Sequence, residues 1–337
     1  MSDQIKFGPV VIASYLLMGA ALLLVMGTGL LAALFSGLLV YSLVHLLTPA
    51  LGQKISGERA RMIAVALLGA LIVALLSAAI WGLVSFLQSD AGSLQKLLQR
   101  MADIIDASRD QIPDWLRDNL PQNAEAIREL FTVWLREHAA QAKTLGQEAG
   151  RTIAHLLIGM VIGAMAALYN TKTLSNYRPL AAALHGRIVN LEQSFRNVVF
   201  AQVRIAAINA VLTGIYLMVI LPLAGVHLPL TKSMIAITFF AGLLPVIGNL
   251  ISNTVLVVVG LSHSLYIAIG SLVFLIIIHK LEYFLNAKII GSHINAKVWE
   301  LLTAMLALEA LFGVPGVIAA PVLYAYVKKE LSDRALV

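Results

Sequence analysis

Apolar residues fill most of the chain in long runs that are separated by short polar segments. A helix needs about 20 apolar residues to cross the hydrocarbon core of a bilayer. Six uninterrupted runs approach or exceed that length: Phe7–Met26, Leu30–Leu47, Met62–Phe86, Thr152–Asn170, Val198–Ala224 and Leu265–Leu285. The pattern therefore predicts an all-α polytopic membrane protein with six full transmembrane helices.

Two further apolar runs are interrupted near their middles. Ser233–Leu261 is broken at Pro245–Asn249, and Leu301–Tyr326 is broken at Gly313–Gly316. Glycine and proline end helices, and each half that remains, at about 12–14 residues, is too short to cross alone. We predict two re-entrant helical hairpins, which brings the apolar segments to eight. Kinked full spans are the alternative.

Lysine and arginine near the span ends set the orientation, because they collect on the cytoplasmic side. They are enriched at Thr48–Arg61, at Tyr177–Arg196 and after Tyr326. Hairpins also place the lysines of Lys280–Lys297 inside, whereas full spans would place them outside. The charge bias therefore favours hairpins, cytoplasmic N- and C-termini, and a location in the bacterial inner membrane.

Three regions follow from this layout. Residues 1–87 hold the first three spans, and residues 152–337 hold the transport core with hairpins at 233–261 and 301–326. Residues 88–151 between them are rich in aspartate and carry apolar residues at helical spacing, so they form a small extracytoplasmic insert of amphipathic helices that runs into the fourth span. The stripe Leu180, Leu184, Ile188, Leu191 and Phe195 predicts an interfacial helix on the inner side.

Composition supports a lipid environment. The chain has 337 residues, of which 59% are apolar and 12% are charged, whereas soluble domains carry about 25% charged residues. A net charge of +6 is what positive inner loops produce, so no nucleic-acid partner is expected. The chain contains no cysteine and no phosphate-binding loop, so we expect no thiolate metal site, no ATP hydrolysis and no cofactor. The first apolar run is too long for a signal-peptide core, and no cleaved leader is expected.

Broken apolar segments are the best sequence indication of a transporter's solute site. Non-helical backbone at membrane depth is tolerated where it is buried in protein or lines a polar cavity. The candidate solute- and ion-binding residues are those at the two breaks, together with two acidic residues: Pro245, Gly248, Asn249, Asn253, Gly313, Pro315, Gly316, Glu282 and Glu309.

The two acidic candidates each have a structural alternative. Glu309 lies one turn before Gly313 inside an apolar run, where a carboxylate is costly and therefore a functional candidate. It could instead bond a free backbone N–H at the tip. Glu282 could bind an ion or form a local ion pair with Lys280. Glu300, in contrast, is expected to cap the first half of the second hairpin.

The C-terminal part of the chain resembles a known family. Gly242-Leu-Leu-Pro-Val-Ile-Gly248, Leu281-Glu282, Asn286-Ala-Lys-Ile-Ile-Gly291 and Leu311-Phe-Gly-Val-Pro-Gly-Val-Ile-Ala-Ala-Pro321 occur in this order. The set is similar to the motifs of the autoinducer-2 exporter family of bacterial membrane permeases. The resemblance implies secondary transport of a small solute, with autoinducer-2 and sodium/proton exchange both assigned within the family.

Two other functions stay open at this point. The insert could recruit an envelope partner and make the protein a non-transporting scaffold. Gly260-Leu-Ser262-His263 faintly resembles a membrane serine-protease motif, although no His-Glu-x-x-His zinc motif is present, and we expect no enzyme. The remaining partners expected are the lipid bilayer, a small solute or Na⁺/H⁺, and further copies of the chain, because glycine and alanine in the first spans suit close packing within or between protomers.

Overall fold

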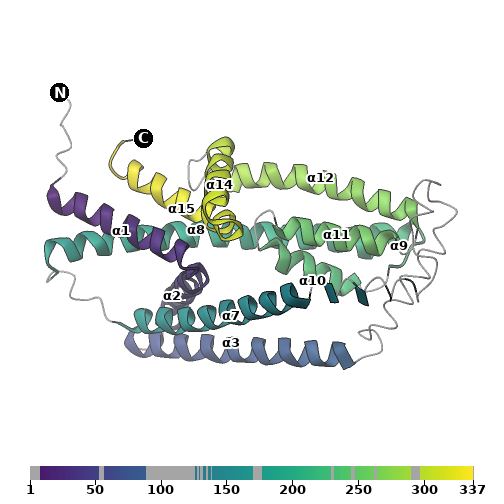
Figure 1. Ribbon diagram of the computed structural model, residues 1–337, viewed down its shortest axis with the longest axis horizontal. Coiled ribbons are helices and arrows are strands. Elements are labelled where there is room, and N and C mark those ends of the chain that lie inside the picture. The colour runs from purple at the N-terminus through teal and green to yellow at the C-terminus, as the bar shows by residue number, and fades with distance from the viewer. Residues whose placement is uncertain are drawn as a thin grey trace. The chain divides into compact units, whose positions relative to one another are not determined.

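The computed structural model describes residues 8–52, 57–88, 139–169, 177–228, 231–243, 247–261, 264–289 and 297–336, with six single positions between 126 and 137. The described residues contain helices and no strand (Figure 1). They fall into two compact units. The first holds residues 1–69, 151–203 and 284–337, and the second holds residues 70–150 and 204–283.

Four of the six predicted full spans coincide with stretches that are long and apolar enough to cross a membrane. These are Pro9–Gly27, Leu31–Leu51, Gly146–Leu168 and Pro179–Leu223. The corresponding helices are α1 (Pro9–Gly27), α2 (Leu31–Gly52), α7 (Ala139–Leu168) and α8 (Pro179–Ile215). The chain is therefore a multi-pass helical membrane protein.

The other two predicted spans are also helical. Met62–Phe86 lies within α3 (Gly57–Gln88), and Leu265–Leu285 lies within α12 (Leu265–Ile289), whose Tyr266–Ile278 portion is a shorter apolar helix. The predicted insert falls mainly outside the described residues. Its last part is helical from Ala139 onward and continues without a break into the fourth span, as expected.

The predicted interfacial helix at residues 180–195 is corrected by the structure. Leu180 to Phe195 belong to α8, which continues through a π-helical turn, η3 (Tyr216–Ile220), into α9 (Leu221–Leu223). Leu191 and Phe195 are buried in the core, whereas Leu180 and Ile188 of the same stripe are exposed, so the stripe is part of a long packed helix and not a separate element. The π turn precedes Pro222, whose ring would clash with the carbonyl one turn back in a regular helix, and the wider turn relieves that clash.

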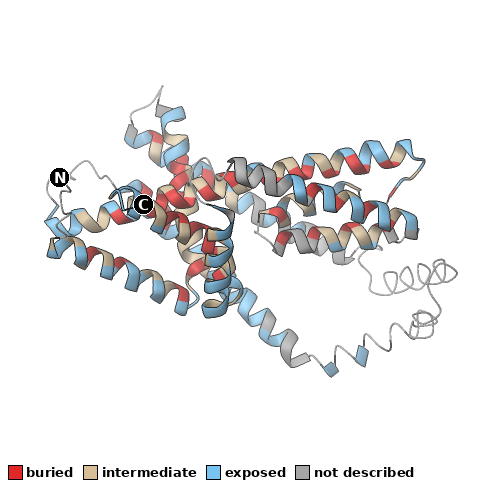
Figure 2. Ribbon diagram, turned by 90° about the horizontal axis from the view of Figure 1, so that it is seen from above, coloured by how far each residue is buried: buried red, intermediate tan, exposed pale blue. Residues whose placement is uncertain are grey.

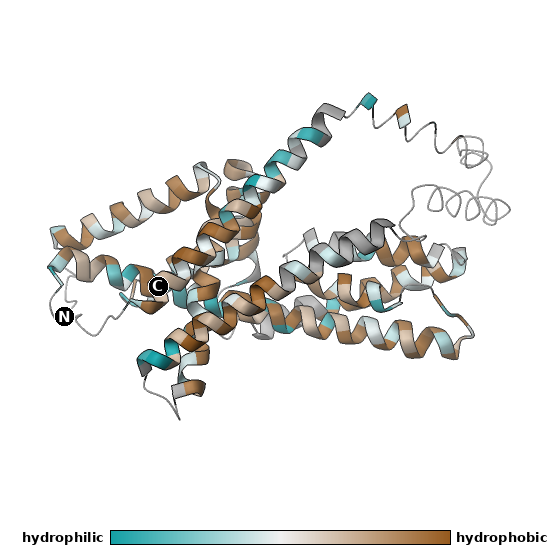
Figure 3. Cartoon of the chain, turned by 90° about the horizontal axis from the view of Figure 1, so that it is seen from below, coloured by the Kyte–Doolittle hydropathy of each residue, from teal (hydrophilic) through white to brown (hydrophobic). Residues whose placement is uncertain are grey.

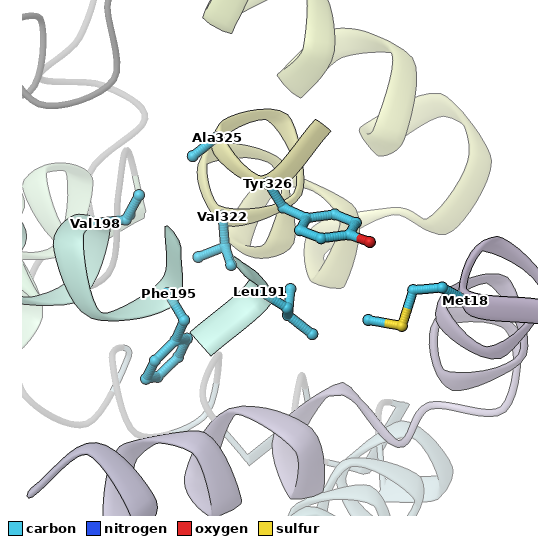
Figure 4. Close-up of a cluster of buried hydrophobic side chains, with 7 residues drawn as sticks. All are labelled: Met18, Leu191, Phe195, Val198, Val322, Ala325 and Tyr326. Carbon is cyan, nitrogen blue, oxygen red and sulfur yellow. The ribbon is translucent and has the colours of Figure 1, made fainter. Parts of the chain in front are cut away.

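The first unit has its core around α15 (Val314–Ser332). Val322, Ala325 and Tyr326 of α15 pack against Leu191, Phe195 and Val198 of α8 and against Met18 of α1 (Figure 4). The ring of Phe35 on α2 packs against that of Phe195 with centroids 5.2 Å apart and ring planes tilted by 59°. Helices α1, α2 and α8 thus surround the last helix of the chain.

A close crossing of α2 and α7 completes that unit. A Cβ added at Gly159 would lie 2.1 Å from the Ala33 carbonyl oxygen, and one at Gly163 would lie 2.1 Å from that of Gly37. The Ser36 hydroxyl donates to the Leu156 carbonyl at 2.9 Å. This is the small-xxx-small packing of membrane helices. In contrast, a Cβ added at Gly19, Gly27 or Gly29 would have nothing within 4 Å in the described part of the chain.

The second unit packs η3 and α9 against three other helices, α10 (Thr231–Gly242), α11 (Ile247–Leu261) and α12. Its core contains Leu217, Leu221, Met234, Leu256 and Leu275. Tyr216 stacks on Phe274 with centroids 4.1 Å apart, and its hydroxyl lies 3.1 Å from the Ser271 hydroxyl. The hydroxyl of the tyrosine in this core thus has a hydrogen-bond partner.

Many of the residues that face outward are hydrophobic. Leu16 is 69% exposed, Leu306 is 70% exposed and Leu223 is 84% exposed. Exposed surface is common along the helices in Figure 2, and most of the same helices are apolar in Figure 3. Apolar surface on this scale is what lipid contact requires.

Candidate functional site

Helices α10 and α11 flank the first break in the apolar pattern and pack against each other. Gly248 lies in the first turn of α11 and is buried. A Cβ at this position would lie 1.7 Å from the Ala241 carbonyl oxygen at the end of α10. Because that distance is far inside van der Waals contact, glycine is required for the two helix ends to meet.

The polar candidates of this tip lie on α11 or beside it. Asn253 is partly buried one turn and a half further along the helix. Asn249 is in the first turn, but its side chain lies outside the described part, as does Pro245 altogether. Glu282 belongs to α12, and its side chain is likewise not described.

The second broken segment repeats this arrangement with α14 (Val298–Phe312) and α15. Gly313 joins the two helices with φ +64° and ψ −145°, a conformation that L side chains rarely adopt. Its N–H donates to the Glu309 carbonyl at 2.6 Å. Pro315 lies in the first turn of α15, where its missing N–H costs nothing. A Cβ at Gly316 would lie 1.9 Å from the Leu308 carbonyl oxygen.

The helices at both breaks therefore pack in the same way. In each, a glycine in the first turn of the second helix abuts a carbonyl oxygen in the last turn of the first helix. The sequence predicted breaks at these positions, and at each one the break lies between two helices that pack against each other.

The Glu309 side chain is exposed on α14. Its carboxylate does not accept the tip N–H, which was the structural alternative. The Gly313 N–H donates to the backbone carbonyl of Glu309 instead. With the residues that the structure describes, the carboxylate makes no hydrogen bond or ion pair. It stands among exposed apolar residues of the same helix such as Leu306 and Leu311.

Glu300 and Lys328 form an ion pair that joins the open end of the second hairpin. Glu300 caps α14, as predicted, by accepting the Lys297 N–H at 3.1 Å. It also accepts hydrogen bonds from Tyr324 and, at 2.7 Å, from Lys328. The bond from Lys328, then those from Tyr324 and Lys297, lower the pKa of Glu300 from 4.5 to about 2. In turn, the hydrogen bond to Glu300 raises the pKa of Lys328.

The candidate residues divide between the two compact units. Gly248, Asn249, Asn253 and Glu282 fall in the second unit, and Glu309, Gly313, Pro315 and Gly316 fall in the first. Each hairpin therefore carries its own candidate residues. No group of three or more His, Asp or Glu side chains that could hold a metal ion occurs among the described residues.

Sequence reasoning missed a buried ion pair between Arg187 of α8 and Glu330 of α15. Their side chains are 8% and 5% exposed. Glu330 also accepts from the Tyr15 hydroxyl at 3.2 Å and from Asn190 at 3.0 Å. The Arg187 guanidinium lies 3.8 Å over the Tyr15 ring. A signal was present, since Arg187 lies four residues before Leu191 on the apolar stripe and thus on its buried face.

The fold and these sites define a polytopic helical membrane protein with two glycine-closed hairpins near its C-terminal end. Comparison with known proteins gives the family. A sequence model described as "AI-2E family transporter" matches residues 10–333. The chain belongs to the AI-2E family of transporters, as its C-terminal motifs indicated.

A curated relative agrees with this assignment. The chain is 32% identical over 129 residues to "Putative transport protein YdbI" of Bacillus subtilis (strain 168). The match covers 37% of this chain and 35% of that protein, so the chain spans about a third of the relative's length. No solved structure matches the chain.

Proposed function

We propose that this protein is a secondary transporter that moves a small solute or cation across the bacterial inner membrane, driven by a proton or sodium gradient. Membership of a transporter family supports the class. The observation that carries the proposal is the pair of hairpins, each closed by a glycine against a carbonyl oxygen. Paired breaks of this kind are where transporters bind their solutes.

Helix length supports re-entrance. Helix α10 has 12 residues, and α11 and α14 have 15 each. At 1.5 Å per residue they are roughly 18–23 Å long, whereas the hydrocarbon core is about 30 Å thick. The apolar part of α15 ends at Tyr326, before Lys328. The proposal takes the sides from the lysine and arginine bias of the loops, so that the first hairpin enters and leaves from outside, the second from inside, and the N- and C-termini are cytoplasmic.

In this proposal each hairpin tip offers its own contacts to the solute. The N-termini of α11 and α15 carry the positive ends of the helix dipoles, which attract anions and polar oxygen atoms. Around the first tip the proposed contacts are Pro245, Gly248, Asn249, Asn253 and Glu282. Around the second tip they are Gly313, Pro315 and Gly316.

Glu309 is proposed as a coupling carboxylate. An ionised side chain on an apolar helix in a membrane requires a partner or a wet cavity. An exposed carboxylate on α14 meets this requirement where it faces the solute path, and there it can exchange a proton or hold a sodium ion. We further propose that the protein is a homo-oligomer, because the glycines of α1 are free of close contacts within the described chain and allow a second helix to approach.

Ion flux in sealed proteoliposomes tests the function. An internal pH dye reports proton movement after a sodium pulse, for the wild type, for Glu309→Gln and for Glu58→Gln, which removes an exposed acidic group at the start of α3. The proposal predicts a sodium-dependent signal that Glu309→Gln abolishes and Glu58→Gln keeps. Absence of any signal from folded wild-type protein would contradict coupling to these ions and make autoinducer-2 the next solute to test.

A further inference from the structure

Two acidic side chains buried in the first unit have different surroundings. Glu330 is 4% exposed and is matched by Arg187, Tyr15 and Asn190. Glu192 of α8 is 8% exposed, and among the described residues its carboxylate has one hydrogen-bond partner, the Ser42 hydroxyl of α2 at 2.7 Å. Ser42 itself is fully buried. One buried carboxylate is thus neutralised by a cation and the other is not.

The cations near Glu192 do not pair with it. Arg187 on the same helix is committed to Glu330. Arg196, one turn further along α8, makes no ion pair within the described part of the chain. Tyr41 of α2 is close enough to Glu192 and to Arg61 of α3 for both charges to act on its hydroxyl. The His45 ring packs against Tyr41 with centroids 4.1 Å apart and ring planes tilted by 33°. Arg61 donates instead to the Tyr169 carbonyl at 3.5 Å.

A buried carboxylate without a counterion is unfavourable as an anion, so it either takes up a proton or binds a cation. The chemistry of Ser42 suits the first of these. A hydroxyl donates to a carboxylate and accepts from a carboxylic acid, so the contact between the two side chains survives in both protonation states. An arginine partner, which only donates, would favour the ionised carboxylate.

We propose that Glu192 and Ser42 form a proton-binding site. The Glu192 carboxylate takes a proton from water, and the Ser42 hydroxyl holds the carboxyl group in position. The proposal rests on the proposed function, because it supplies a protonatable group for gradient-coupled transport. The site is separate from Glu309, which is exposed. The binding step is a proton transfer alone: the carboxylate becomes a neutral acid on protonation and returns to the anion on release.

Infrared pH-difference spectroscopy of the full-length protein in lipid nanodiscs and sodium-free buffer tests the site without requiring transport. Because all 18 acidic side chains contribute C=O bands under acid, the site is isolated by subtracting the spectrum of a variant from that of the wild type. We expect the subtraction of Glu192→Gln to leave a narrow carboxylic-acid C=O band at the high frequency of an acid shielded from water, and the subtraction of Glu58→Gln to leave only the lower-frequency band of a water-exposed acid. Ser42→Ala should keep the band but move it to higher frequency, because loss of the hydroxyl removes a hydrogen bond that weakens the C=O bond. Glu192→Asp keeps a carboxyl group and should retain a band, so it is the control if Glu192→Gln does not fold.

Spectra of folded Glu192→Gln that match the wild type throughout the titration would overturn the proposal. An unshifted band in Ser42→Ala would overturn the role of Ser42. The test is separable from that of the proposed function. A Glu192-dependent band in a protein that shows no ion flux would support the site and contradict coupled transport. Ion flux without the band would support coupled transport and contradict the site.

Discussion

The buried ion pair of Arg187 and Glu330 connects two helices that are far apart in the sequence. Because both side chains are almost fully buried, each depends on the other for its charge to be tolerated. The Tyr15 ring and hydroxyl bring α1 into the same network. At the residue scale this is the strongest polar constraint on the first unit.

Removing one member of this pair should therefore cost more than removing both. We expect Arg187→Met to destabilise the protein by about 3–5 kcal/mol, because Glu330 is left as a buried unpaired charge. The double variant Arg187→Met with Glu330→Met should recover much of that loss. Thermal unfolding in detergent measures both. A double variant as unstable as the sum of the two single variants would contradict a direct pairing.

Glu300 should make stability depend on pH. Its pKa is lowered to about 2 in the folded protein from 4.5, so the folded state favours the ionised form. This stabilisation is fully present above about pH 4.5 and is lost as the pH falls toward 2. We expect the melting temperature of the wild type to fall across this window.

The Glu300→Gln variant should melt at a lower temperature than the wild type at neutral pH and should show a smaller fall under acid. Glu309→Gln is the matched control, because the Glu309 carboxylate on the same helix has no partner among the described residues. If the two variants gave the same acid profile, Glu300 would not be the group responsible.

Among the helical elements, the hairpin turns depend on single glycines. Gly316→Ala would place a methyl group 1.9 Å from the Leu308 carbonyl oxygen, so α14 and α15 must separate. Overpacking of a tight contact costs about 1–3 kcal/mol, and a clash with backbone is at the upper end. Gly248→Ala should have the same effect on the first hairpin.

Gly19→Ala on α1 is the control for these substitutions, because nothing lies within 4 Å of the added methyl group. We expect Gly316→Ala and Gly248→Ala to lower the melting temperature and the yield of monodisperse protein, with Gly19→Ala close to the wild type. A well-folded, fully stable Gly316→Ala protein would show that the helices of the hairpin are not in backbone contact.

The sequence predicted most helices because bilayer thickness imposes long apolar runs, and it predicted the hairpin turns because glycine and proline interrupt those runs. It did not reveal that Gly159 and Gly163 meet α2, although their four-residue spacing is the usual signal for such a crossing. It also separated the stripe at Leu180–Phe195 from the span that follows, because a change from polar to apolar composition need not end a helix. Contacts between distant residues, such as Ser42 with Glu192, leave no periodic pattern.

For the whole molecule, the central claim is that the two hairpins enter the membrane from opposite faces. The chain contains no cysteine, so single cysteines can be introduced without background. Ser233→Cys and Ser264→Cys flank the first hairpin, and Lys297→Cys and Ser332→Cys flank the second. Re-entrant hairpins keep the two members of each pair on the same side, whereas full spans place them on opposite sides.

The most direct measurement is labelling of these single-cysteine variants in intact cells with a membrane-impermeant thiol reagent that crosses the outer envelope. Our account predicts labelling at Ser233→Cys and Ser264→Cys, and labelling at Lys297→Cys and Ser332→Cys only after the inner membrane is opened. If residues 233 and 264 were accessible from opposite sides, the first segment would be a full span, and the proposed solute site at the hairpin tips would be contradicted.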